Sequence, residues 1–168
     1  FEETELRLRP VDRVTAFGSS IDQTVRRIQT AYDLRGLTTT VTSYDNATVG
    51  QGTVINQAEF EYDDFGQLSK DAQSHSGAVD GSTPAGSYAF TNASGGNAAR
   101  LTTLTYPDGR QLDFAYGAAN SHDDLLSRVA SQQINGELSV LAKYQYVGLD
   151  WFVEIEYPEP SVHLSYLK

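Results

Sequence analysis

The sequence has no cysteine and no methionine, and it has few basic residues for its length. Without cysteine, disulfides, thiolate metal sites and a cysteine nucleophile are excluded. The 12 Lys and Arg stand against 22 Asp and Glu, for a net charge of −10 at pH 7. Such a charge opposes binding to phosphate backbones and to anionic lipid surfaces. We therefore expect no nucleic acid among the partners of this chain.

Long apolar runs are also absent. No stretch approaches the roughly 20 apolar residues that a membrane span requires, so we expect no membrane insertion. The chain begins at Phe1 without a recognisable signal segment, and we interpret it as a piece of a longer protein or a processed product. Its 168 residues, 39% of them hydrophobic, suffice for one domain over 1–168.

Residues typical of β-strands are abundant, with 10 Tyr and 7 Phe. Apolar and polar residues alternate with the period of two that predicts half-buried strands. The segments concerned are 54–62, 112–116, 138–146, 151–157 and 162–166. By this alternation Leu138 and Val140 share one face, whereas Phe152 lies on the face opposite to Ile155. The predicted fold class is all-β.

Glycine-containing dipeptides separate these strands. Asn135-Gly136 predicts a tight type I′ turn, in which both central residues have positive φ. Asp108-Gly109, after Pro107, predicts a second turn between strands. Consecutive strands are therefore expected to pair as antiparallel hairpins.

Two segments leave more than one interpretation. Within 19–33, Ile21, Val25 and Ile28 have helical spacing, yet residues 26–32 also alternate as a strand. We favour the strand because it leads directly into a Tyr-Asp turn, and we leave the rest of 1–24 unassigned. The segment 71–99 is rich in Gly, Ser and Ala and predicts a long loop with a short strand at 88–90.

A short motif, Tyr-Asp-x-x-Gly, recurs along the chain. Two copies and one looser relative are formed by Tyr32, Asp33 and Gly36, by Tyr62, Asp63 and Gly66, and by Tyr106, Asp108 and Gly109. The tyrosine supplies a ring that packs at a strand end, the aspartate accepts backbone N–H bonds of a turn, and the glycine takes a positive φ. Each copy is predicted to form the corner of a hairpin.

With these copies, and with its ending from "YQYVGL" to "VHLSYLK", the chain resembles the RHS or YD-repeat family. These are large bacterial cell-surface and secreted proteins related to the animal teneurins. The resemblance extends from about Val25 to Lys168. It implies antiparallel β-hairpin repeats in a twisted, spiralling sheet, an extracellular or cell-surface location, and a structural role in a wall, scaffold or fibre. The implied partners are flanking repeats or further copies of the chain.

No residue set predicts catalysis, a metal site or a cofactor. His75, His122 and His163 lack the spacing of metal ligands. The carboxylates of Asp63-Asp64 and Asp123-Asp124 are adjacent and point in different directions, whereas glycoside hydrolysis needs two groups roughly 5–10 Å apart. Calcium held by loop carboxylates is a weaker alternative, because no run has alternating oxygen ligands. We expect a chain that is not an enzyme.

Four aromatic residues near the end of the chain leave a second function open. Tyr144, Tyr146, Trp151 and Phe152 lie on neighbouring predicted strands, where such rings mostly fill a core. If exposed, the same rings would stack on sugars. The alternative is therefore a cell-surface binding or adhesion module that recognises glycans or a protein partner.

Overall fold

The computed structural model describes residues 12–13, 18, 20, 22–91 and 99–166. It is all-β over these residues, with twelve strands and one four-residue helix. All described strand pairs are antiparallel. The predicted fold class is thereby confirmed. The chain divides into two compact units, Phe1–Gly86 and Ser87–Lys168.

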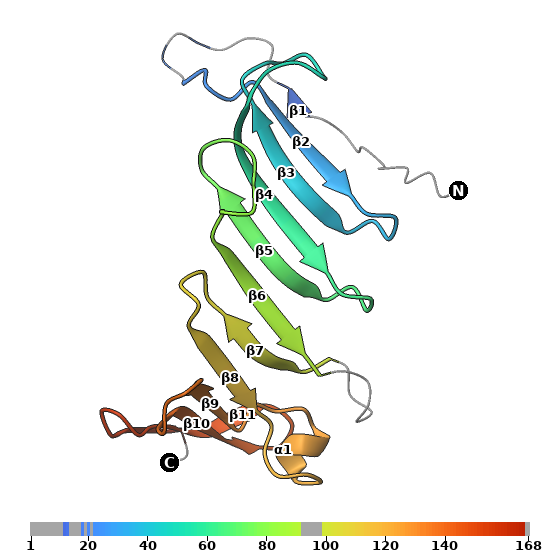
Figure 1. Cartoon of the computed structure of the whole chain (residues 1–168). Helices are drawn as coiled ribbons and strands as arrows, with labels where there is room; N and C mark the ends of the chain where they lie inside the picture. Colours follow the sequence, from blue (N-terminus) through green and yellow to red (C-terminus); the bar gives the residue numbers. More distant parts are fainter. Residues whose placement is uncertain (1–11, 14–17, 19, 21, 92–98, 167–168) are drawn as a thin grey trace. The chain divides into compact units, whose positions relative to one another are not determined.

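The first unit is a sheet in which strands lie side by side in chain order (Figure 1). Its strands are β1 (Asp12–Arg13), β2 (Arg27–Tyr32), β3 (Thr38–Tyr44), β4 (Val54–Tyr62) and β5 (Leu68–Ser74). The strand interpretation of 26–32 is confirmed by β2. The long loop predicted over 71–99 is wrong at its start, because residues 71–74 continue β5.

In the second unit the strands also lie in the sheet in the order in which they occur along the chain. It contains β6 (Ala85–Phe90), whose first two residues belong to the first unit, β7 (Leu101–Thr105), β8 (Gln111–Ala115), α1 (His122–Leu125), β9 (Ser131–Ile134), β10 (Val140–Val147), β11 (Trp151–Tyr157) and β12 (Val162–Ser165). The short strand predicted at 88–90 is part of β6. Residues 92–98 of the predicted loop, and most of 1–21, lie outside the described residues.

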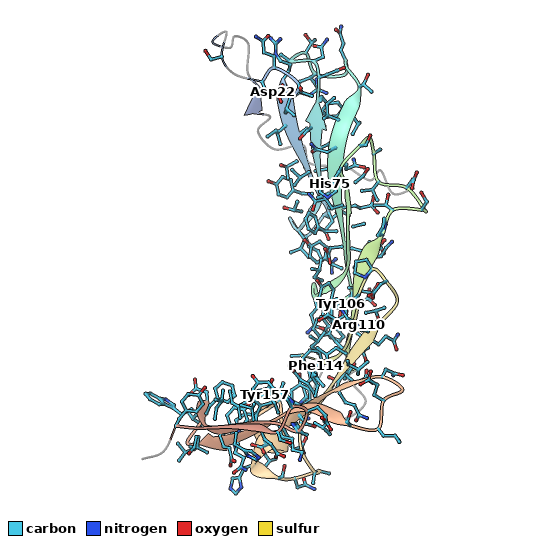
Figure 2. All side chains as sticks on the ribbon, turned by 90° about the vertical axis from the view of Figure 1, so that its left-hand side faces the viewer. Asp22, His75, Tyr106, Arg110, Phe114 and Tyr157 are labelled. Atoms are coloured by element: carbon cyan, nitrogen blue, oxygen red, sulfur yellow. The ribbon has the colours of Figure 1, made fainter. Side chains whose placement is uncertain are left out.

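Few hydrophobic side chains are buried in either unit. Those below a tenth exposed, among the described residues, are Ala31, Ala72 and Ala142. The described strand contacts join each strand to its sheet neighbours only. Side chains accordingly stand on both faces of the ribbon around His75 and around Phe114 (Figure 2). Stability in such a sheet comes mainly from backbone pairing and from side chains opposite one another on adjacent strands.

A register shift in the β10–β11 pair changes the face of one aromatic residue. Tyr144 lies opposite Ile155, but Tyr146 lies opposite Phe152, because the register shifts between Gln145 and Tyr146. Residues directly opposite each other share a face, so Phe152 lies on the face of Ile155. The predicted alternation, which placed them on opposite faces, is wrong here. The ring of Phe152 lies 5.6 Å from that of Tyr144 and 4.9 Å from that of Tyr146.

Other sequence predictions in the second unit also need correction. Leu138 lies before β10 and is fully exposed rather than half-buried. The last predicted strand forms as β12, yet Val162 and Leu164 are each 41% exposed. Asn135-Gly136 turns the chain with Glu137 N donating to Ile134 O (3.1 Å), but Gly136 alone of the two has a positive φ. The turn is therefore not type I′.

Candidate functional site

The tip of the first hairpin, between β2 and β3, is organised by Asp33. Its backbone N donates to Leu37 O (2.8 Å), and Gly36 N donates to Asp33 O (3.0 Å). Its side-chain Oδ1 accepts from the backbone N of Arg35 and of Leu37, both at 2.9 Å. Gly36 has a φ of 87°, which a residue with a side chain rarely adopts.

The tip between β4 and β5 has the same bonds around Asp63. Asp63 N donates to Gln67 O (2.9 Å), and Gly66 N donates to Asp63 O (3.0 Å). Oδ1 of Asp63 accepts from Phe65 N (2.9 Å) and from Gln67 N (2.8 Å). The two Tyr-Asp-x-x-Gly copies therefore form equivalent tips.

The looser copy, between β7 and β8, aligns with an offset of one residue. Tyr106 N donates to Arg110 O and Gly109 N donates to Tyr106 O, both at 2.8 Å. Tyr106 thus occupies the position of Asp33 and Asp63, and it does not correspond to Tyr32 or Tyr62. Asp108 instead accepts from Arg110 N (3.0 Å). Counting three residues back from the glycine would have revealed the offset.

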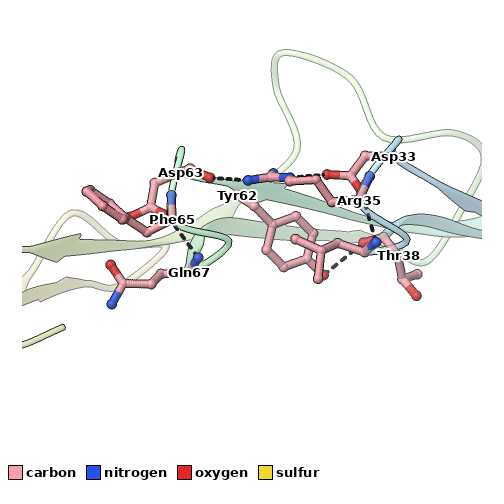
Figure 3. A network of polar contacts seen from close by, with 8 residues as sticks. Asp33, Arg35, Thr38, Tyr62, Asp63, Phe65 and Gln67 are labelled. Atoms are coloured by element: carbon pink, nitrogen blue, oxygen red, sulfur yellow. Dashed lines mark hydrogen bonds and ion pairs between the residues drawn. The ribbon is translucent and has the colours of Figure 1, made fainter. Parts of the chain in front are cut away.

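Arg35 joins the first two tips (Figure 3). Its Nε lies 2.8 Å from Oδ2 of Asp33, and its Nη1 donates to the backbone O of Asp63 at 2.6 Å. Tyr62 adds a second link, since its hydroxyl donates to Thr38 O at 2.9 Å. Desolvation by itself would raise the pKa of the Asp33 carboxyl. The hydrogen bonds from Arg35 and Leu37 outweigh desolvation, so this pKa lies below its ordinary value.

At the opposite end of the first hairpin, Arg27 is the largest fully buried side chain in the described part of the chain, at 2% exposed. Its Nη1 donates to the backbone O of Asn46 (3.0 Å), Thr48 and Gln51 (3.1 Å). Its guanidinium lies 3.9 Å from the ring centroid of Tyr44. Arg27 therefore holds the loop between β3 and β4 against the hairpin that precedes it.

Two arginines of the second unit hold loops in the same manner. Arg100 stacks on Tyr116 (5.1 Å) and pairs with Asp124 (2.6 Å). Arg128 stacks on Tyr146 (4.7 Å) and donates to Gly148 O (2.7 Å). In each case an arginine at the start of one strand, or up to three residues before it, meets a tyrosine within one residue of the end of the next strand. We call these three pairs the arginine clamps: Arg27 with Tyr44, Arg100 with Tyr116, and Arg128 with Tyr146.

Sequence reasoning missed the arginine clamps, although a spacing signal exists. Arg27 and Arg100 each stand nine residues before their turn glycine, Gly36 and Gly109. Gln57 stands nine residues before Gly66, and its Oε1 accepts from Val79 N (2.9 Å) in the loop that follows β5. The position nine residues before the turn glycine therefore carries a side chain that reaches the following loop.

An open groove of about 720 Å³ lies beside the β10–β11 turn. We call it the aromatic groove; its lining residues are Val147, Asp150, Trp151, Phe152, Val153 and Tyr166. Trp151 is 76% exposed and Phe152 is 45% exposed. Two of the four aromatics predicted as binding residues thus line the groove.

The other two predicted aromatics, Tyr144 and Tyr146, are half-buried in the sheet. The hydroxyl of Tyr144 donates to Gln132 Oε1 (3.0 Å), and that of Tyr146 donates to Val129 O (2.8 Å). Desolvation raises the pKa of both hydroxyl groups. Their rings contact the ring of Phe152, and neither residue lines the groove.

No protein-family model matches the chain, and the search of curated proteins finds no match to it. Function is therefore inferred from the residues and their geometry.

Three of the four carboxylates considered for catalysis are engaged in the structure, and the fourth, Asp64, is exposed. Asp123 pairs with Arg128 and Asp124 pairs with Arg100, each at 2.6 Å, while Asp63 holds its turn. The three histidines are exposed, and His163 lies 3.3 Å from Glu154. Within the described residues, no three His, Asp or Glu side chains gather as a metal ion would require. The described helix is too short to cross a membrane.

Proposed function

We propose that this chain is a non-catalytic structural segment of a larger extracellular or cell-surface protein, where its β-hairpin repeats form part of a spiralling sheet. The observation that carries the proposal is that the described strands contact only their sheet neighbours and bury just three hydrophobic side chains. An assembly of this kind grows by adding units along one direction. Its faces and edges are left for flanking repeats or further copies to cover.

The recurrence of the hairpin tips supports a repeat architecture. The tips at Asp33 and Asp63 share their backbone and side-chain hydrogen bonds, and Arg35 joins one tip to the next. Such contacts between consecutive hairpins are what a stack of similar units requires. Together with the Tyr-Asp-x-x-Gly copies, they favour a wall, scaffold or fibre of the RHS or YD-repeat kind.

Electron microscopy of the negatively stained chain, with its mass in solution measured by light scattering, tests the structural role. Filaments, rings or hollow particles are expected if the chain assembles by itself. A small, uniform monomer at high concentration would contradict self-assembly. In that case a longer chain that includes neighbouring sequence should show whether added repeats lengthen the sheet.

The aromatic groove favours a second candidate, which is glycan binding. Trp151 and Phe152 expose ring surface beside the carboxylate of Asp150, a combination suited to stacking on a sugar ring and accepting its hydroxyl protons. Neutral glycans are favoured over acidic ones by the carboxylate and by the net charge of −10.

Fluorescence tests the glycan candidate directly, because Trp151 is the only tryptophan of the chain. Titration with a panel of neutral oligosaccharides should change its emission. For a responding sugar, calorimetry should show binding lost in Trp151→Ala and retained in Phe65→Ala, which removes a similarly exposed aromatic ring (67%) at a hairpin tip. A flat response across the panel rejects this candidate.

A further inference from the structure

The turn between β10 and β11 is held by Arg128, which lies before β9. Nη1 of Arg128 donates to Gly148 O (2.7 Å) and to Leu149 O (3.4 Å). Asp150 and Trp151, which line the aromatic groove, follow these two residues directly in the sequence. One guanidinium therefore fixes the backbone that leads into the groove.

A second path joins Arg128 to the groove through two rings. Its guanidinium lies 4.7 Å from the ring centroid of Tyr146. The ring of Tyr146 lies 4.9 Å from that of Phe152, which lines the groove. Arg128 is thus connected to the groove both through the turn and through a ring packed against its lining, although it is not itself a lining residue.

Arg128 is itself fixed by Asp123. Its Nε and Nη2 both donate to Oδ1 of this carboxylate, at 2.9 and 2.6 Å. The side chain of Arg128 is 10% exposed. The carboxylate offsets the positive charge, and the planar guanidinium presents its donors to Asp123 and to the turn at once. A lysine would keep the charge, but a single ammonium group does not reproduce this arrangement.

We propose that Arg128 is a positioning residue of the aromatic groove, which holds the turn in the shape in which Asp150 and Trp151 meet a neutral glycan together. A site whose groups are ordered before binding loses less conformational freedom when the ligand binds, so its affinity is higher. Arg128 acts through geometry rather than through its charge, which Asp123 offsets. The inference rests on the glycan candidate and names a residue outside the groove on which the affinity depends.

Arg100 offers a matched control in the same unit. It pairs with Asp124, the neighbour of Asp123, and it stacks on Tyr116, so it is an arginine clamp as well. Among the described contacts, Arg100 reaches none of the residues that line the groove. Arg100→Lys therefore removes a similar set of contacts and leaves the groove as it is.

Two measurements, one without ligand and one with it, test the inference. Trp151 is the only tryptophan, so the decay of its fluorescence anisotropy reports the motion of the indole at the groove. Without ligand, the indole should move more freely in Arg128→Lys than in the wild type, whereas Arg100→Lys should match the wild type. For a neutral oligosaccharide that the wild type binds, the affinity of Arg128→Lys should fall by about tenfold or more, and that of Arg100→Lys should stay within about twofold. Circular dichroism should show that each variant is folded.

A second variant serves if Arg128→Lys does not fold. Asp123→Asn keeps the arginine but weakens the pair that fixes it, so it should loosen the indole in the same direction, with Asp124→Asn as its control. Indole motion equal to that of the wild type in the folded variants at Arg128 and Asp123 would overturn the inference, and so would an unchanged affinity for the sugar. If these variants loosen the indole while the wild type binds no sugar of the panel, the positioning role is supported and the glycan candidate is rejected.

Discussion

The guanidinium of Arg35 donates a 2.6 Å hydrogen bond to the backbone carbonyl of Asp63, so the tip of one hairpin holds the tip of the next. The same side chain pairs with Asp33 in its own turn at 2.8 Å. Its side chain is 44% exposed, and exposed ion pairs of this kind contribute at most about 1 kcal/mol to stability. The link orients neighbouring turns more than it stabilises them.

Removal of the buried arginine should cost far more than removal of the exposed one. Arg27→Met leaves three carbonyls of the β3–β4 loop without their donor, and we expect a loss of about 2–4 kcal/mol in the free energy of unfolding. Arg35→Met should cost less than about 1 kcal/mol. Urea unfolding measures both variants, and equal losses would contradict the structural role of Arg27.

The hydroxyl of Tyr62 should contribute measurably, whereas that of Tyr106 should not. Tyr62→Phe removes the bond to Thr38 O and should lower the free energy of unfolding by about 0.5–1.5 kcal/mol. Tyr106, which takes the place of an aspartate in its turn, has no hydroxyl bond among the described contacts. Tyr106→Phe is therefore the control and should be close to neutral. A cost at Tyr106 equal to that at Tyr62 would show that the two tyrosines are equivalent after all.

Acid should weaken the tip at Asp33. The pKa of this carboxyl is lower in the folded state than its ordinary value of 3.8, so its stabilising contribution is present above that pH. The contribution is lost as the pH falls below 3.8 and through the folded-state pKa. Unfolding measured at pH 6 and at several values below 4 should show this loss. Asp33→Asn should be less stable at pH 6 and should flatten the acid dependence, and an unchanged slope would contradict the prediction.

Two glycines with similar backbone angles should respond differently to alanine. Gly36 and Gly52 have φ values of 87° and 89°, so both substitutions carry the strain of a left-handed residue, about 1–2 kcal/mol. A Cβ at Gly36 would meet nothing within 4 Å. A Cβ at Gly52 would lie 2.5 Å from Oδ1 of Asp45, so Gly52→Ala should cost about 3 kcal/mol or more. Thermal unfolding measures the loss of stability in Gly36→Ala and in Gly52→Ala. Equal losses would show that the loop around Gly52 can move to accommodate the added Cβ, and would contradict the prediction.

The local elements were readable from the sequence. Alternation with a period of two predicted β4, β8, β10 and β11, because half-buried strands place successive side chains on opposite faces. The chemistry of a turn is local as well. Asp33 accepts N–H groups two and four residues ahead of it, so the residue types and their spacing are visible in a short stretch of sequence.

The candidate sites were only partly readable, because exposure depends on what covers a residue. Trp151 and Tyr144 are both aromatic residues on predicted strands, yet one is 76% exposed and the other is half-buried against Phe152 and Gln132. The arginine clamps depend on contacts with loops many residues away. The spacing of nine residues before Gly36 singles out Arg27, but the burial of its side chain depends on the loop that encloses it.

By itself the sequence determined that this chain forms antiparallel strands joined by Asp- and Gly-dependent turns, since both depend on neighbouring residues. The tertiary structure alone decided which residues meet. A register shift moved Phe152 to the face of Ile155, and three loop carbonyls enclosed the guanidinium of Arg27. The physical reason is the same in each case: register and burial are set by which strand or loop lies opposite, and pairing across strands selects that partner only when the whole sheet forms.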